Sequence, residues 1–273
     1  MKLLIKLSGK VLEEIALRRE VCRQICSLWA AQHEVVVVHG AGKQLTELCK
    51  QLGIPVVQHQ GRRVTDEKTL EAAKMVFSAV NRDLVALLVS HRVPALGLAA
   101  FDGLLTVAVR RPPLVIENPG EPAQEIDFGL VGDIKEVQSD RLAQLTAQRF
   151  LPVVSSLCAD ESGQILNINA DTLAADFAIA LGCDRLMSIS DVDGVYLDPR
   201  DPSTRISRMS AVEARGYLKQ GAFTEGMIPK VQTALKAVEN GVAAFQVASG
   251  IRPNGLLEAL EGAAGTLLTR DDD

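Results

Sequence analysis

The chain has 273 residues, of which 47% are hydrophobic, 23% charged and 4% aromatic, and its formal net charge is -5 at pH 7. The apolar share is large enough to fill a core, which excludes intrinsic disorder as the main state. The length suits one large domain or two modest ones. The acidic balance argues against a dedicated nucleic-acid binder, and the few aromatic side chains argue against a base-stacking platform.

The start of the chain, MKLLIKLSGKVLEE, has its first apolar run interrupted by Lys6. A signal peptide needs an apolar stretch of about 7–15 residues and a membrane span about 18, and the sequence contains neither. We therefore expect a cytoplasmic protein with no membrane partner. The cysteines are odd in number and form no CxxC pair, so we expect them to be reduced and packed as small apolar residues. They are Cys22, Cys26, Cys49, Cys158 and Cys183.

Strand-like apolar runs alternate with segments of helical spacing along the whole chain. In chain order the patterns predict a strand at 2–7, a helix at 12–31, a strand at 34–38, helices at 43–52 and 65–89, and a strand at 93–99. Hairpins and loops are predicted at 104–137, then a helix at 141–149, a strand at 151–155, a helix at 170–181 and a strand at 185–190. After a surface loop at 198–203 come helices at 211–220 and 227–240, a strand at 243–247, a short helix at 255–260 and a strand at 265–268. The last residues, 271–273, are expected to be a frayed end. This alternation implies a parallel-rich α/β sheet with helices on both faces, and a boundary between two lobes is placed near Gly182.

Two glycine turns each follow a predicted strand and open a predicted helix, one at Gly9 and one at Gly40-Ala41-Gly42. Backbone N–H groups and the helix dipole at such a junction can hold an anion, and glycine lets a phosphate approach the backbone closely. Neither turn is a Walker A loop, because Ser or Thr does not follow the Gly-Lys pair, and neither completes a dinucleotide-binding fingerprint. Taken alone, each is also compatible with an ordinary turn.

Four further stretches place polar or charged residues at predicted element ends. Arg62 and Arg63 precede a predicted helix start at Thr65 or Asp66. The stretches 167–171 (NINAD) and 226–231 (GMIPKV) lie at two other helix starts, and 190–195 (SDVDGV) follows a strand. A cation in a first helical turn, as in GMIPKV, opposes the helix dipole, so a purely structural role is disfavoured there.

Together and in this order, these segments resemble the amino acid kinase family, and in particular its N-acetylglutamate kinase branch. The most specific segments are RVTDEKTLEAAKMV, NINAD and GMIPKV, and the resemblance runs from Lys6 to the last strand. It implies a three-layer αβα sandwich with a central, mainly parallel sheet and two lobes. The N-terminal lobe, 1–182, would bind the acylated amino acid and mediate dimerisation, and the C-terminal lobe, 183–273, would bind ATP.

The resemblance also implies roles for single residues. The catalytic residues would be Lys6, Asp171 and Lys230, with the aspartate orienting two lysines that contact the transferring phosphoryl group. Arg63 would hold the α-carboxylate of the substrate, within a substrate site formed by Gly40, Ala41, Gly42, Arg63, Asn167 and Asn169. The nucleotide site would comprise Lys6, Gly9, Ser190, Asp191, Met227 and Lys230.

The implied activity is the ATP-dependent phosphorylation of the γ-carboxylate of N-acetyl-L-glutamate in arginine biosynthesis, with Mg²⁺ bound through the nucleotide and no dedicated metal cluster. A γ-carboxylate with a pKa of about 4.3 is already ionised at neutral pH, so no general base is required and none of the four histidines needs that role. Related substrates, namely acetylaminoadipate or a carrier-linked aminoadipate, remain alternatives, as does a non-catalytic amino-acid or nucleotide sensor. The acidic balance mildly opposes a carrier, and the presence of both lysines and Asp171 argues against a sensor.

The sequence departs from the family pattern at two places. Ser8 stands where a glycine is usual, and Ala41 interrupts a run of glycines; both are expected to add a Cβ near the phosphate or carboxylate. Because the first predicted strand begins at Lys2, no N-terminal helix of the kind found in arginine-inhibited, hexameric members is expected. We therefore expect a homodimer that is insensitive to arginine.

Overall fold

The computed structural model describes residues 1–59, 61–116, 122–223 and 226–270 of the chain. A central sheet of eight strands runs through it in the order β16-β18-β17-β13-β1-β2-β10-β5. All neighbouring pairs are parallel except β17 and β18, so the predicted mainly parallel sheet is confirmed. In that order the strands are Arg208–Ser210, Thr266–Thr269, Ala244–Ser249, Arg185–Ser190, Lys2–Leu7, Glu34–His39, Leu151–Ser155 and Ala95–Ala99.

Helices cover both faces of this sheet, which gives the three predicted layers. One face packs against α1 (Lys10–Glu13), α2 (Ile15–Ala30), α3 (Gly42–Gln51), α4 (Glu67–Ser90) and α9 (Gly255–Leu260). The other packs against α5 (Ser139–Ala147), α6 (Ala170–Leu181), α7 (Ala211–Lys219) and α8 (Ile228–Glu239). Side chains alternate along each strand, so Leu3, Ile5 and Leu7 of β1 enter the first core cluster while Leu4 enters the second.

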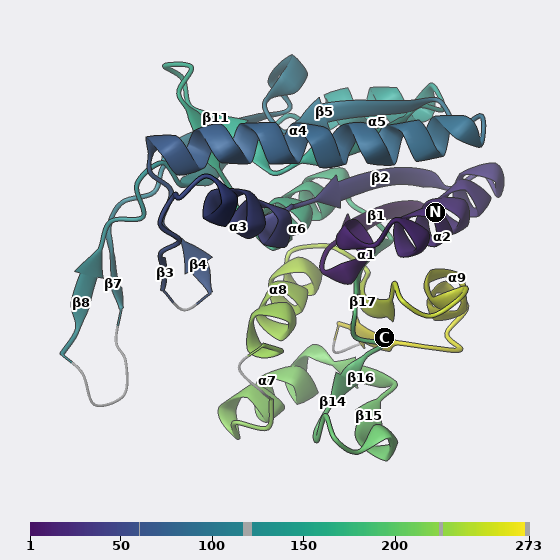
Figure 1. Ribbon diagram of the computed structural model, residues 1–273. Helices are drawn as coiled ribbons and strands as arrows, with labels where there is room; N and C mark the ends of the chain where they lie inside the picture. The colour runs from purple at the N-terminus through teal and green to yellow at the C-terminus, as the bar shows by residue number, and fades with distance from the viewer. Residues whose placement is uncertain (60, 117–121, 224–225, 271–273) are drawn as a thin grey trace.

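Short antiparallel pairs of strands lie outside the central sheet. Figure 1 shows the hairpin of β7 (Leu114–Ile116) and β8 (Gln124–Ile126) projecting away from the body of the molecule. The other pairs are β3 (Gln58–His59) with β4 (Arg62–Arg63), β6 (Thr106–Arg110) with β9 (Gly132–Val137), β11 (Leu157–Ala159) with β12 (Ile165–Asn167), and β14 (Val195–Tyr196) with β15 (Arg205–Ile206). Two 3-10 turns, η1 (Asp102–Leu104) and η2 (Pro202–Thr204), complete the described elements.

The predicted elements are present, with one break and some short additions. The helix expected at 12–31 is wrong in one respect, because Glu14 adopts an extended conformation (φ -91, ψ 119) and separates α1 from α2. Residues 117–121 of the predicted hairpin region and the expected frayed end at 271–273 lie outside the described residues. No helix in the described part of the chain is long and apolar enough to cross a membrane.

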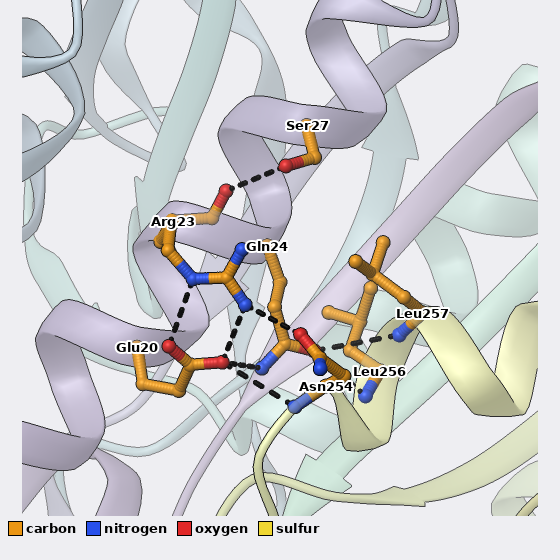
Figure 2. A network of polar contacts seen from close by, with 7 residues as sticks. All are labelled: Glu20, Arg23, Gln24, Ser27, Asn254, Leu256 and Leu257. Atoms are coloured by element: carbon orange, nitrogen blue, oxygen red, sulfur yellow. Dashed lines mark hydrogen bonds and ion pairs between the residues drawn. The ribbon is translucent and has the colours of Figure 1, made fainter.

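A polar network joins α2, from the start of the chain, to α9, near its end (Figure 2). Gln24 is fully buried, and its Oε1 accepts hydrogen bonds from the backbone N–H groups of Leu256 (2.9 Å) and Leu257 (3.4 Å). Glu20 accepts from Gln24 Nε2 at 2.9 Å and from Asn254 N at 3.3 Å. The hydrogen bonds from Arg23 are the main reason that the pKa of Glu20 falls to about 2. A glutamine of one helix thus serves as the N-terminal cap of another.

The carboxyl ends of β1, β2, β10 and β13 meet at one edge of the sheet. The chain leaves β1 toward β2 on one side, whereas it leaves the neighbouring β13 toward β16, β17 and β18 on the other side. In open α/β sheets, ligands bind outside the carboxyl ends of the strands at such a switch point. Both glycine turns lie there.

Candidate active site

Lys6 and Asp171 form a largely buried ion pair at this edge. The alternation of β1 directs Lys6 to the face covered by α6, and the residue is only 5% exposed. Its Nζ lies 2.8 Å from Oδ1 of Asp171 in the first turn of α6. Because a buried ammonium group is costly without a partner, this contact fixes where the lysine charge is held.

Lys230 brings a second positive charge to the same place from the first turn of α8. Its Nζ donates to Oγ of Ser190, at the end of β13, over 2.9 Å. Burial lowers the pKa of Lys230, repulsion from Lys6 lowers it further, and Asp171 and Asp191 oppose both effects. Two ammonium groups close enough to repel each other form a local cationic site inside an acidic chain, which suits a multiply charged anion.

The two glycine turns border these lysines. Gly9 has φ 66 and ψ -146, and a Cβ there would lie 3.2 Å from Oδ1 of Asp191. A Cβ on Gly40 would lie 3.2 Å from the Cβ of Ala170, the first residue of α6. The first turn therefore faces the end of β13, and the second faces the helix that carries Asp171.

Arg63 is held beside the second glycine turn. Its Nη2 donates to the Gly42 carbonyl at 3.2 Å and to Oγ1 of Thr46, while Nη1 is buried with no partner among the described residues. Burial lowers the pKa of Arg63, although its guanidinium remains charged at neutral pH. An engaged guanidinium whose Nη1 has no partner is suited to receive a carboxylate.

The two asparagines of the NINAD segment are placed differently. Asn167 donates from Nδ2 to Oγ1 of the buried Thr65 at 3.2 Å, which brings it to the segment that carries Arg63. Asn169 instead caps α6, since its Oδ1 accepts from the N–H groups of Asp171 (2.8 Å) and Thr172 (3.1 Å). Its side-chain carbonyl is thus engaged in the helix cap, while its Nδ2 has no partner within the described part of the chain.

The two departures from the glycine pattern are both anchored within the protein. Ala41 is 1% exposed and belongs to the first core cluster, so its side chain packs in the interior. The Ser8 hydroxyl donates to the Ile189 carbonyl at 3.3 Å, on the strand beside its own. Both additional side chains are therefore directed into the protein.

The remaining predicted residues lie on the side of β13 and α8. Met227 is the N-cap residue of α8 and packs partly against the second core cluster, and Asp191 is exposed directly after β13. Sequence reasoning missed Lys43, whose Nζ pairs with Oε1 of Glu13 at 3.0 Å across the two glycine turns. It also missed Thr65 and the buried Ser156, which lies beside Gly40. In the sequence, these residues could have been found only by their position, because each stands next to a motif residue or at the end of a strand.

The site contains two cationic side chains and is bordered by glycine turns at the carboxyl edge of a parallel sheet. This arrangement is typical of α/β proteins that bind and transfer phosphoryl groups. The comparison with family models then assigns it: the chain belongs to the amino acid kinase family, whose model matches residues 1–249.

Individual relatives agree with this assignment over nearly the whole chain. The acetylglutamate kinase of Myxococcus xanthus (strain DK1622) is 37% identical over 273 residues, covering 98% of this chain and 88% of the relative. That of Sorangium cellulosum (strain So ce56) is 41% identical over 269 residues, covering 97% and 94%.

Solved structures show the same fold at lower identity. An N-acetylglutamate synthase from Neisseria gonorrhoeae, complexed with coenzyme A and N-acetyl-glutamate, matches with a TM-score of 0.83 and 21% identity over 100% of this chain and 60% of its own. A carbamate kinase from Giardia matches with a TM-score of 0.73 and 17% identity over 99% of both chains.

Proposed function

We propose that the chain is a kinase that transfers the γ-phosphoryl group of ATP to the γ-carboxylate of N-acetyl-L-glutamate. The observation that carries the proposal is the pair of lysines, Lys6 and Lys230, at the carboxyl edge of the sheet. Asp171 contacts Lys6 and raises the pKa of Lys230. The acetylglutamate kinases that match nearly the whole chain at 34–41% identity supply the substrate.

The chemistry requires positioning and charge neutralisation more than proton transfer. The acceptor carboxylate is already ionised, so the main barrier is bringing this anion against a polyphosphate. Lys6 and Lys230 would neutralise the transferring phosphoryl group from two sides, and Asp171 would keep Lys6 aimed at it. Amides of the turns at Gly9 and Gly40-Ala41-Gly42 would add hydrogen bonds to the developing charge.

Substrate and nucleotide would occupy opposite sides of the two lysines. On the side of β2, Arg63 would hold the α-carboxylate with its free Nη1, and Asn167 and the Nδ2 of Asn169 would contact the rest of the acylated amino acid. On the side of β13, the site for ATP would comprise Gly9, Ser190, Asp191, Met227 and Lys230. This division corresponds to the proposed lobes 1–182 and 183–273.

Mg²⁺ fits this scheme as a companion of the nucleotide. Within the described part of the chain, no group of three or more His, Cys, Asp or Glu side chains could hold a metal ion. We therefore propose that the phosphates of ATP hold the ion, which would offset part of their negative charge.

The proposed enzyme is a cytoplasmic homodimer. The five cysteines are free, and burial raises the pKa of the Cys22, Cys158 and Cys183 thiols to about 12, which fits a reducing compartment. The long helix α4 runs along the surface of the molecule (Figure 1). Its outer face exposes Met75 (61%) and Val89 (51%), and small residues between them would let a second copy pack closely.

The test is a substrate panel in which the acyl phosphate is trapped as a hydroxamate. N-acetyl-L-glutamate should be phosphorylated in preference to acetylaminoadipate, free glutamate and UMP. Preference for another member of the panel would contradict the proposed substrate.

Each catalytic lysine should matter for turnover more than for substrate affinity. Lys6→Ala and Lys230→Ala should each lower kcat by about 100-fold or more, because each removes a charge that acts on the transferring group. The control is Lys219→Ala, at the exposed end of α7, which should retain wild-type kcat. A Lys230→Ala variant with normal turnover would contradict the assigned role.

A further inference from the structure

His39 is a buried histidine that the proposed reaction leaves without a role. It is the last residue of β2, directly before the second glycine turn, and it is fully buried. Its Nδ1 lies 3.0 Å from the carbonyl oxygen of Gly40, and its Nε2 lies 3.0 Å from Nδ2 of Asn81 on α4. The ring thus connects a helix on one face of the sheet to the turn that borders the two lysines.

The hydrogen-bond partners determine which nitrogen of His39 carries the proton. Asn81 Nδ2 also donates to the Val153 carbonyl at 2.8 Å, so this atom is the amide nitrogen and not the oxygen. Its second hydrogen is assigned to Nε2 of His39 at 3.0 Å rather than to the Leu98 carbonyl at 3.5 Å, so Nε2 accepts it. The proton then resides on Nδ1, which donates to Gly40. Burial keeps the ring neutral by lowering the pKa of His39 to about 4.

Asn81 has no freedom to turn away from His39. It is 3% exposed, and a Cβ on Gly97 of the neighbouring β5 would overlap its Oδ1. The amide therefore fills space that only a glycine leaves open. An asparagine on the apolar face of α4 is costly unless its polar atoms are paired; Nδ2 reaches two acceptors here, whereas Oδ1 is buried with no partner among the described residues.

The peptide between Gly40 and Ala41 is held by this network. Its carbonyl faces His39, and in a trans peptide the N–H group points to the opposite side. The N–H of Ala41 consequently points away from α4, and it has no hydrogen-bond acceptor among the described residues.

We propose that His39 and Asn81 are positioning residues that fix the Gly40–Ala41 peptide so that the Ala41 N–H can donate to the phosphoryl group in transfer. This inference rests on the proposed kinase function of the site. Neither side chain contacts a reacting atom; they act through the orientation of one backbone amide. An amide held in place before the reaction needs no reorientation when charge develops.

The first test reads the protonation of His39 without any turnover. In ¹⁵N-histidine-labelled protein, the imidazole shifts of His39 should show the neutral Nδ1–H tautomer from about pH 5 to 8, above its lowered pKa. In Asn81→Leu the fixed acceptor role of Nε2 is lost, and the Ala41 amide signal should shift. An Nε2–H tautomer or a charged ring in the wild type overturns the inference, even if the enzyme proves to use another substrate.

The second test replaces His39 with asparagine or with glutamine. Only asparagine keeps an N–H donor at the position of Nδ1. The Nδ2 of His39→Asn lies at the same distance from the backbone as Nδ1 of histidine, whereas His39→Gln lacks a donor there. His39→Gln should lower kcat by about 10–100-fold and His39→Asn by less than about tenfold, with KM for ATP nearly unchanged in both. Since glutamine fills more of the space, His39→Gln should nevertheless have the higher Tm.

If His39 were merely structural, the variant with the higher Tm would also have the higher kcat. A lower kcat in His39→Gln together with its higher Tm therefore supports a positioning role. The matched control is Gln24→Leu, a buried amide that caps α9 and should lose Tm while keeping kcat. Equal turnover of the two folded His39 variants, with an active wild type, overturns the inference and leaves the kinase function standing. An inactive wild type across the substrate panel overturns the function, and the tautomer measurement still decides the state of His39.

Discussion

Lys6 and Lys230 carry the same charge in unlike surroundings. Lys6 is matched by Asp171 at 2.8 Å, whereas the direct partner of Lys230 is the neutral hydroxyl of Ser190. Burial and repulsion by Lys6 then lower the pKa of Lys230. The charge of Lys230 therefore depends on pH closer to the working range than that of an ordinary lysine.

A pH profile tests this difference. As pH rises through a lowered pKa, Lys230 loses its proton, so kcat/KM should fall on the alkaline side below the ordinary lysine pKa of about 10.4. In the kcat profile, bound polyphosphate should move this decline to higher pH. Lys230→Arg should remove the decline, because a guanidinium does not titrate there. An unchanged alkaline decline in that variant would show that another group causes it.

Gly9 occupies backbone space that other residues enter only with strain. At φ 66 and ψ -146, with Asp191 Oδ1 3.2 Å from the position of a Cβ, Gly9→Ala should destabilise the fold by about 1–3 kcal/mol. It should also lower kcat, since the added methyl group displaces Asp191 or blocks the phosphate. Urea unfolding and the hydroxamate assay measure the two effects. Gly216→Ala, inside α7 with open space around it, is the control and should be neutral or stabilising.

Resemblance to a family predicted most of the candidate site, and composition alone predicted little of it. Lys6, Asp171 and Lys230 lie far apart in the sequence, so their meeting depends on strand order, which spacing does not reveal. The direction of the Ala41 side chain is set by packing behind the turn, which the sequence motif does not reveal. Asn81 carried a usable signal, since it is a polar residue on the apolar face of a predicted helix.

At the scale of elements, segments of five or more residues were predicted to within a few residues, and strands of two or three residues were missed. The helices at 170–181 and 255–260 and the strands at 151–155 and 185–190 have the predicted bounds. The edge strand β16 has three residues, too few for any periodicity, and β11, β12, β14 and β15 are equally short. Their pairing is decided by tertiary contacts.

The capping of α9 by Gln24 gives a prediction about stability. Gln24→Leu leaves the N–H groups of Leu256 and Leu257 without their acceptor and should cost about 1–2 kcal/mol in the free energy of unfolding. Protection of these two amides against hydrogen exchange should fall more than that of residues in β1. A uniform loss of protection across the protein would contradict a local capping role.

For the whole molecule, the outer face of α4 predicts how two copies associate. Ala79 lies one turn beyond Met75 on the exposed side of this helix, so Ala79→Glu should place a charge within the proposed interface and yield monomers by light scattering. Ala147→Glu, at the exposed end of α5, is the control and should remain dimeric. A dimer that survives Ala79→Glu unchanged would place the interface elsewhere.

The central position of β1 has a consequence for the time at which the protein can fold. The first strand to be made pairs with β2 almost at once, but the partners on its other side come much later; the contact from Lys2 to Asp184 spans 182 residues. At about 5–20 residues per second, a ribosome needs about 10–40 s to cover that distance. Throughout this interval the second edge of β1 has unpaired backbone groups, and the two lysines remain on separate stretches of nascent chain. Catalytic competence is thus acquired only after α8, which carries Lys230, has been made.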